Sequence, residues 1–213
     1  MKKYIFGLIL FLTACTVAPM SGNLPETFLA SHTGNIDDGG ILTKKPCGPP
    51  CFRNITVGIT SEKDVVVKIK SDETFSKCSA FDHTTQSGVR GITCRSISIG
   101  FDSSDIVEMI LFYPTTIIML SQVIDSYGTP DGVDVGYINL TDSPPRVAMT
   151  LWYSSLQTKI YLLQDGNQFF ANPDSKVDRV SYFEKGTYNQ LRLSFSDNIV
   201  DWRGYESYKI TTK

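Results

Sequence analysis

The sequence predicts an α+β domain: an antiparallel sheet with helices on one face, built as a tandem α-β-β(-β) repeat. Two amphipathic helical stretches are each followed by strand-like stretches that are joined by short turns. Short connections require antiparallel pairing, because parallel strands need a long crossover. The two helix starts, Ser61 and Leu120, lie about 59 residues apart, which indicates internal duplication.

The first repeat begins with a helix from Ser61 to about Lys70. Ser61 and Asp64 approximate a capping box, in which a hydroxyl and a carboxylate satisfy free amides at a helix start. Val65, Val66 and Ile69 form one apolar face. Alternating apolar residues predict a strand at 97–101. A turn at 102–105 and an apolar strand at 106–113 complete a hairpin.

The second repeat begins with a helix at 120–127. Leu120, Val123, Ile124 and Tyr127 follow helical spacing, and Gly128-Thr129-Pro130 ends the helix. Strands are expected at 135–140, 147–153, 159–164 and 179–183. The tail from Leu191 carries enough apolar area to fold back on the core.

The N-terminus predicts export and lipid anchoring. Two lysines precede the apolar run 4–13, which is too short to span a bilayer, so residues 1–14 are expected to be a cleaved signal peptide. Leu12-Thr13-Ala14-Cys15 resembles the lipobox of bacterial lipoproteins. The resemblance implies cleavage before Cys15, acylation of Cys15 with palmitate or a similar chain, and anchoring in the membrane on the extracytoplasmic side. The alternative is an ordinary signal peptide with a chance cysteine.

Three further regions follow the signal peptide. Residues 15–46, rich in Pro, Gly and Asp, are expected to form the lipidated cysteine and a flexible tether. Residues 47–114 form the first α+β unit, and residues 115–213 form the second unit with the C-terminal tail. Loss of Lys2 and Lys3 changes the formal charge from −2 to −4, and no basic patch stands out, so nucleic acid is excluded as a partner.

The cysteine count agrees with this scheme. Without Cys15, four cysteines remain for pairing outside the cytoplasm: Cys47, Cys51, Cys78 and Cys94. Three connectivities are possible, and spacing favours Cys47–Cys51 with Cys78–Cys94. Two other hypotheses are a redox-active Cys47–Cys51 pair and a zinc site that uses cysteines with His83.

One stretch carries a family resemblance. Ile55 to Val65 (ITVGITSEKDV) resembles the opening of the small outer-membrane lipoprotein family SmpA/OmlA, or BamE, with Gly58, Thr60 and Val65 matching. That family's Gly-x-Pro helix stop is missing from the first unit and stands in the second at Gly128-Thr129-Pro130. Tandem units of this kind resemble the β-lactamase-inhibitor-protein fold, whose curved sheet binds proteins. The Cys-Gly-Pro-Pro-Cys start is similar to uncharacterised lipoproteins of filamentous, Chloroflexi-like bacteria.

The resemblance implies a non-enzymatic envelope protein that binds other proteins. The family has one short unit, so its place in a barrel-assembly machine does not transfer to this chain. The residues agree with the expectation of no enzyme, because no nucleophile elbow, metalloprotease motif or phosphate loop is found and no cofactor is indicated. Neither His32 nor His83 is expected to act as a catalytic base. Residues 172–178 resemble a calcium loop weakly and are expected to be a plain turn.

The aromatic residues allow two hypotheses. They could form a binding surface, or they could fill the core, which is the more common role. The set is Trp152, Tyr153, Trp202, Tyr205 and Tyr208. We therefore expect a membrane-anchored lipoprotein that acts as an interaction or scaffold module for another envelope protein. The alternative is a lipoprotein that binds a small ligand or a glycan.

Overall fold

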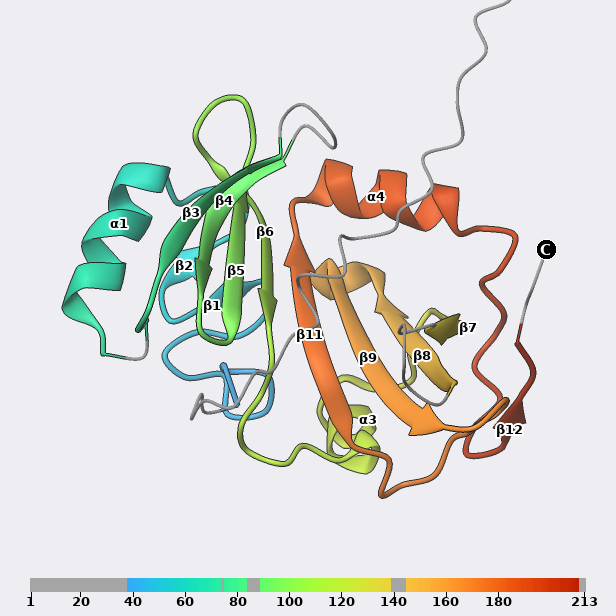
Figure 1. The fold of residues 1–213 in the computed structure, drawn as a ribbon. Coiled ribbons are helices and arrows are strands. Elements are labelled where there is room, and N and C mark those ends of the chain that lie inside the picture. The colour runs from blue at the N-terminus through green and yellow to red at the C-terminus, as the bar shows by residue number, and fades with distance from the viewer. Residues whose placement is uncertain (1–37, 74, 84–88, 139–144, 211–213) are drawn as a thin grey trace, which may run out of the picture. The chain divides into compact units, whose positions relative to one another are not determined.

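The computed structural model is an α+β domain with a large antiparallel sheet, which confirms the predicted fold class. It describes residues 38–210 except 74, 84–88 and 139–144, and not the side chains of residues 82, 83 and 89. Eight strands form this sheet in the order β3-β4-β5-β6-β11-β9-β8-β7 (Figure 1). Their bounds are β3 Ser79–His83, β4 Val89–Cys94, β5 Ile97–Phe101, β6 Val107–Phe112, β7 Gly132–Ile138, β8 Arg146–Tyr153, β9 Thr158–Asp165 and β11 Val177–Phe183.

The two repeats share this one sheet. Each has a helix followed by four strands of the sheet: α1 (Glu62–Ser71) precedes β3 to β6, and α3 (Leu120–Tyr127) precedes β7, β8, β9 and β11. The last strand of each repeat joins them, because β6 pairs with β11 from Phe112↔Val180 to Met109↔Phe183. The sequence predicted two strands after the first helix, whereas the structure has four strands after each helix, all within one continuous sheet.

The two predicted helices begin and end as their capping residues require. The Ser61 hydroxyl accepts a hydrogen bond from the Asp64 amide at 3.2 Å and donates to the Asp64 carboxylate at 2.8 Å. Gly128 ends α3 with φ +76°, a left-handed value that costs glycine little. Val65 of α1 and Leu120 and Val123 of α3 belong to the same core, so both helices cover the same sheet face.

Among the features that were not predicted, three are larger elements of the domain. The first is the edge pair β3–β4, where a Cβ on Gly91 would meet the Ile99 carbonyl oxygen at 2.1 Å and the Phe81 ring at 2.7 Å. The second is the hairpin of β1 (Cys51–Phe52) and β2 (Ile55–Thr56), whose turn residues Arg53 and Asn54 both have positive φ. The third is helix α4 (Lys185–Ser194), capped by the Glu184 carboxylate.

Helix α4 lies on the other face of the sheet, so the prediction of helices on one face holds for α1 and α3 but is wrong for α4. Its Tyr188 packs with Trp152 and Phe183 in a small cluster separate from the main core. In β8, Leu151 and Tyr153 point into the main core and Trp152 points to α4, as strand alternation requires. The sheet is therefore packed on both faces in its second half. A 3-10 turn, η2 (Ser154–Leu156), links β8 to β9, and the short strands β10 (Phe169–Phe170) and β12 (Ser207–Tyr208) pair with each other.

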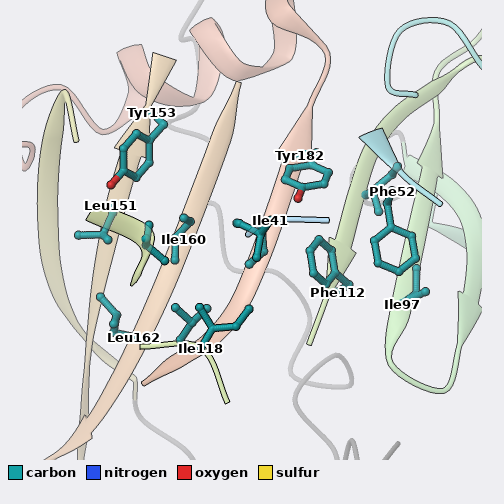
Figure 2. Packing of buried hydrophobic residues seen from close by; sticks show 14 of the residues in the cluster. Ile41, Phe52, Ile97, Phe112, Ile118, Leu151, Tyr153, Ile160, Leu162 and Tyr182 are labelled. Carbon is teal, nitrogen blue, oxygen red and sulfur yellow. The ribbon is translucent and has the colours of Figure 1, made fainter. Parts of the chain in front are cut away.

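The last part of the predicted tether belongs to this core. Ile41 is 0% exposed and lies between Ile160 and Tyr182 among the core side chains (Figure 2). Gly39 has φ +62°, and a Cβ there would meet the Phe112 ring at 2.5 Å, so only glycine fits. Residues 38–42 are therefore part of the globular domain, while residues 15–37 of the expected tether lie outside the described residues.

Asp38 fixes the path of this entering segment. Its carboxylate accepts hydrogen bonds from the amides of Gly40, Leu42 and Thr43 and from the Thr43 hydroxyl. Burial alone would raise the pKa of Asp38, but these hydrogen bonds outweigh burial and lower the pKa. The Tyr127 hydroxyl of α3 donates to the Ile41 carbonyl, and burial raises the pKa of Tyr127 to about 12. The segment is therefore fixed by hydrogen bonds to its backbone amides and to the Ile41 carbonyl, as well as by the burial of the Ile41 side chain.

No helix in the described part of the chain is long and apolar enough to cross a membrane.

Candidate functional site

The four cysteines form two disulfides with the connectivity that spacing favours. Cys47 and Cys51 are bonded with a Cα–Cα distance of 5.7 Å, and Cys78 and Cys94 with 3.9 Å. The first disulfide closes the loop before the β1–β2 hairpin, and Cys47 Sγ also accepts a hydrogen bond from the Asn54 amide at 3.3 Å. The second ties the residue before β3 to the end of β4. Both disulfides brace the first repeat.

The local structure does not favour a redox or zinc role for these cysteines. A reactive thiolate is typically stabilised at a helix N-terminus, but Cys51 begins strand β1 and helix α1 begins eleven residues later at Glu62. The four sulfurs that a zinc site would use are bonded to one another. His83 lies in β3, although its side chain is not among the described residues, and His32 lies outside the described part.

Three of the five predicted aromatic residues fill the core. Trp152, Tyr153 and Tyr208 are each buried, as the core hypothesis expects. Trp152 is separated from the others, because it points to α4 on the opposite face of the sheet. Trp202 is half-buried, and Tyr205 is 43% exposed. The exposure of Tyr205, with the half-buried Trp202 beside it, keeps the surface hypothesis open for the C-terminal segment.

The C-terminal segment gathers its aromatic residues into one cluster beside α3. The Trp202 ring stacks on Tyr208 at 5.8 Å and meets the edge of Tyr205 at 5.9 Å. The ring centroids of Tyr153 in β8 and Tyr127 in α3 lie 6.2 Å apart, and burial, Asp131 and the nearby Tyr205 together raise the pKa of Tyr153. We call these five residues the C-terminal aromatic cluster.

Hydrogen bonds fix the loop that carries Trp202 and Tyr205. The Tyr208 hydroxyl accepts a hydrogen bond from the Arg203 amide at 2.8 Å and donates to the Gly204 carbonyl at 3.0 Å. Val200 is tied to Val133 of β7 by two backbone hydrogen bonds of 2.8 Å. The loop therefore presents Trp202 and Tyr205 from a fixed backbone, which reduces the entropy lost on binding.

The charges around the cluster are mixed. Arg203 lies over the Tyr208 ring at 5.1 Å and forms a 2.7 Å ion pair with Glu206. Asp125 of α3 faces Tyr205, whose pKa is raised by burial and by that carboxylate. An exposed tyrosine, a tryptophan and an arginine on one loop have the composition of a protein-binding hot spot. Arg203 was missed from the sequence, although it stands between the two aromatic residues in Trp202-Arg203-Gly204-Tyr205.

A second charged group lies under α4. Lys159 is 6% exposed, with its ammonium 4.3 Å from the Trp152 ring centroid and 5.1 Å from those of Tyr161 and Phe195. Burial raises the pKa of Asp134, partly opposed by a 2.6 Å hydrogen bond from the Trp152 indole and by the Lys159 charge. The aromatic rings stabilise the buried ammonium. The sequence did not predict the burial of Lys159, because a single lysine at the start of a strand is usually exposed.

The remaining sequence predictions have simple outcomes. Residues 172–175 form a hydrogen-bonded turn in which the Asp174 amide donates to Asn172 Oδ1 at 3.0 Å, as expected for a plain turn. Cys15 and the expected signal peptide lie outside the described residues, so the lipid anchor stays a prediction.

No protein family matches the chain, and neither a curated protein nor a solved structure matches it.

Proposed function

We propose that this protein is a membrane-anchored, extracytoplasmic lipoprotein without enzymatic activity, whose domain binds another envelope protein. Cys15 in its lipobox-like context would hold the chain at the bilayer. Tyr205 and Trp202 of the C-terminal aromatic cluster, together with the neighbouring Arg203, would contact the partner. The observation that carries the proposal is that the exposed Tyr205 and Arg203 and the half-buried Trp202 lie together on a hydrogen-bonded loop.

Two features support a protein partner. Tyrosine, tryptophan and arginine are the residues most enriched where interface binding energy concentrates. The loop is fixed by Tyr208, so its side chains are arranged before the partner arrives. Beside it, Val200 is 39% exposed and adds apolar contact area.

The anchor is tested by changing Cys15→Ser. The unchanged protein is expected in the membrane fraction with an incorporated fatty-acid label, since several acyl chains give durable anchoring. The variant is expected to lose both the label and the membrane association. Equal labelling and membrane recovery of the two proteins would contradict acylation of Cys15.

The binding surface is tested by changing Tyr205→Ala, with Tyr137→Ala as the matched control. Tyr137 is 46% exposed, close to the 43% of Tyr205, and lies on β7 instead of the C-terminal loop. Recovery of one defined partner with the tagged protein from solubilised membranes should fall about tenfold or more for Tyr205→Ala, as expected of a hot-spot residue, and stay unchanged for the control. Equal recovery with both variants would contradict the assigned surface.

A glycan is the second candidate for the same surface, because sugars also bind aromatic residues. One face of the Trp202 ring already stacks on Tyr208, which leaves less ring surface for a sugar. Sedimentation of the protein with insoluble envelope polysaccharide, lost on Tyr205→Ala, would favour the glycan over the protein partner.

A further inference from the structure

A pocket opens at the end of the sheet where β8 and β11 begin. It has a volume of about 370 Å³. It lies where β6 has just ended, where β8 and β11 begin, and beside the later part of β9. The lining residues that matter for its chemistry are Tyr113, Arg146, Leu163, Lys176, Val177 and Asp178. This size is within the range of small-molecule sites in proteins.

The lining combines apolar and charged groups. Leu163 and Val177 provide apolar surface, whereas Arg146 and Lys176 provide two cations. Arg146 Nε is 3.1 Å from the Asp165 carboxylate, but the Asp165 side chain is 82% exposed, so solvent weakens that pair. Asp178 is the one carboxylate among the lining residues.

A buried arginine stands behind this lining. Arg179 is 7% exposed and its guanidinium carbon lies 4.1 Å from the centroid of the Tyr161 ring. Its Nε is buried and has no hydrogen-bond partner among the described residues. A buried cation with an unsatisfied donor is costly unless a nearby negative charge compensates it.

Tyr113 connects Arg179 to the pocket. Burial raises the pKa of Tyr113 and Asp178 raises it further, while the charge of Arg179 and a hydrogen bond with it act in the opposite direction. The phenol therefore keeps its proton near neutral pH and can donate a hydrogen bond. Arg146 and Lys176 line the pocket, and Arg179 adds a third cation next to Tyr113, although the whole chain has a formal charge of −2.

We propose that this pocket binds a small organic anion with a carboxylate or phosphate head and a compact apolar body. The head would lie between Arg146, Lys176 and the Tyr113 hydroxyl, because a guanidinium matches the geometry of both oxyanions. The body would lie on Leu163 and Val177. Arg179 acts as a positioning residue that orients Tyr113. The lining of this pocket shares no residue with the C-terminal aromatic cluster.

The test is an NMR titration of the full chain with benzoate and phenyl phosphate, with benzamide as the neutral probe of similar shape. We expect saturable shifts at the amides of Tyr113, Lys176 and Asp178 with one or both anions, and none with benzamide. The stronger of the two anions identifies the head group. Affinity should fall as salt is added, since binding depends on charge.

Variants locate the binding site. Arg146→Gln and Lys176→Gln should each weaken binding about tenfold, the effect of one charge-assisted hydrogen bond. The exposed Arg95→Gln removes a charge elsewhere and should leave affinity unchanged. Unchanged melting temperatures exclude unfolding as the cause. No saturable shift with either anion, equal binding of benzamide, or equal loss with Arg95→Gln would overturn the proposal.

Discussion

Truncating Ile41 to alanine tests whether the segment at 38–42 is an integral part of the core. Ile41 is 0% exposed and packs with residues of both repeats, including Phe112 and Ile160 (Figure 2). Truncation of a buried isoleucine costs about 2–5 kcal/mol, because transfer energy is lost and a cavity remains. The neighbouring strands are fixed by the sheet and cannot close that cavity, so we expect about 3 kcal/mol.

Urea unfolding followed by tryptophan fluorescence measures this loss as a free energy of unfolding. In a thermal melt, each kcal/mol lowers the melting temperature of a domain of this size by about 2–4 °C, so the expected drop is about 6–12 °C. Ile59→Ala is the matched control, because it makes the same change at a side chain that is 74% exposed. The control should stay within about 0.5 kcal/mol of the unchanged protein. If Ile41→Ala lies within about 0.5 kcal/mol of the control, residues 38–42 do not belong to the core.

Two further predictions concern buried charge and the disulfides. The pKa of Asp134 is raised in the folded protein above its ordinary value of 3.8, so the folded state holds this proton longer than the unfolded state, and stability falls as pH rises through that interval. The free energy of unfolding of Asp134→Asn, relative to the unchanged protein, should therefore increase as pH rises above about 4; a difference that is constant or that decreases would contradict the raised pKa of this carboxylate. Replacing Cys78 and Cys94 by serine should cost about 3 kcal/mol, and replacing Cys47 and Cys51 about 2 kcal/mol, since the longer loop loses more entropy on closure. Urea unfolding of the two double variants checks this order, and a larger loss for the shorter loop would refute the loop-closure explanation.

The elements predicted correctly are those with local signals. Ser61 and Gly128 have chemistry suited to a helix start and a helix end, and both mark the ends observed. The alternation of Ile97, Ile99 and Phe101 with small residues gives β5, whose three apolar side chains point into one core. These patterns depend on neighbours in sequence, so the sequence alone reveals them.

The elements that were missed depend on distant partners. Strand β4 contains Gly91, which weakens any strand pattern and makes sense only where Phe81 covers it. Helix α4 buries Tyr188 against Trp152, from a different strand, and has little apolar periodicity of its own. Ile41 stands in a stretch of Asp and Gly that is typical of a linker, and only the sheet explains its burial.

The candidate sites show the same limit. Spacing favoured the two disulfides, because both close locally. The sequence could not show that Trp152 and Trp202 lie in different clusters, because only the fold places them on opposite faces of the sheet. The pocket cations Arg146 and Lys176 lie thirty residues apart in sequence and meet only because β8 and β11 begin at the same end of the sheet.

A photo-crosslinking residue placed at position 205 in the anchored protein tests the central claim most directly. The same residue at position 137, which is similarly exposed, is the control. The proposed function predicts one defined crosslinked protein from position 205 in intact membranes, absent from position 137 and reduced when Arg203→Ala is added. Crosslinking of the same proteins from both positions, or none from position 205, would contradict the assignment of the C-terminal aromatic cluster as the partner-binding surface.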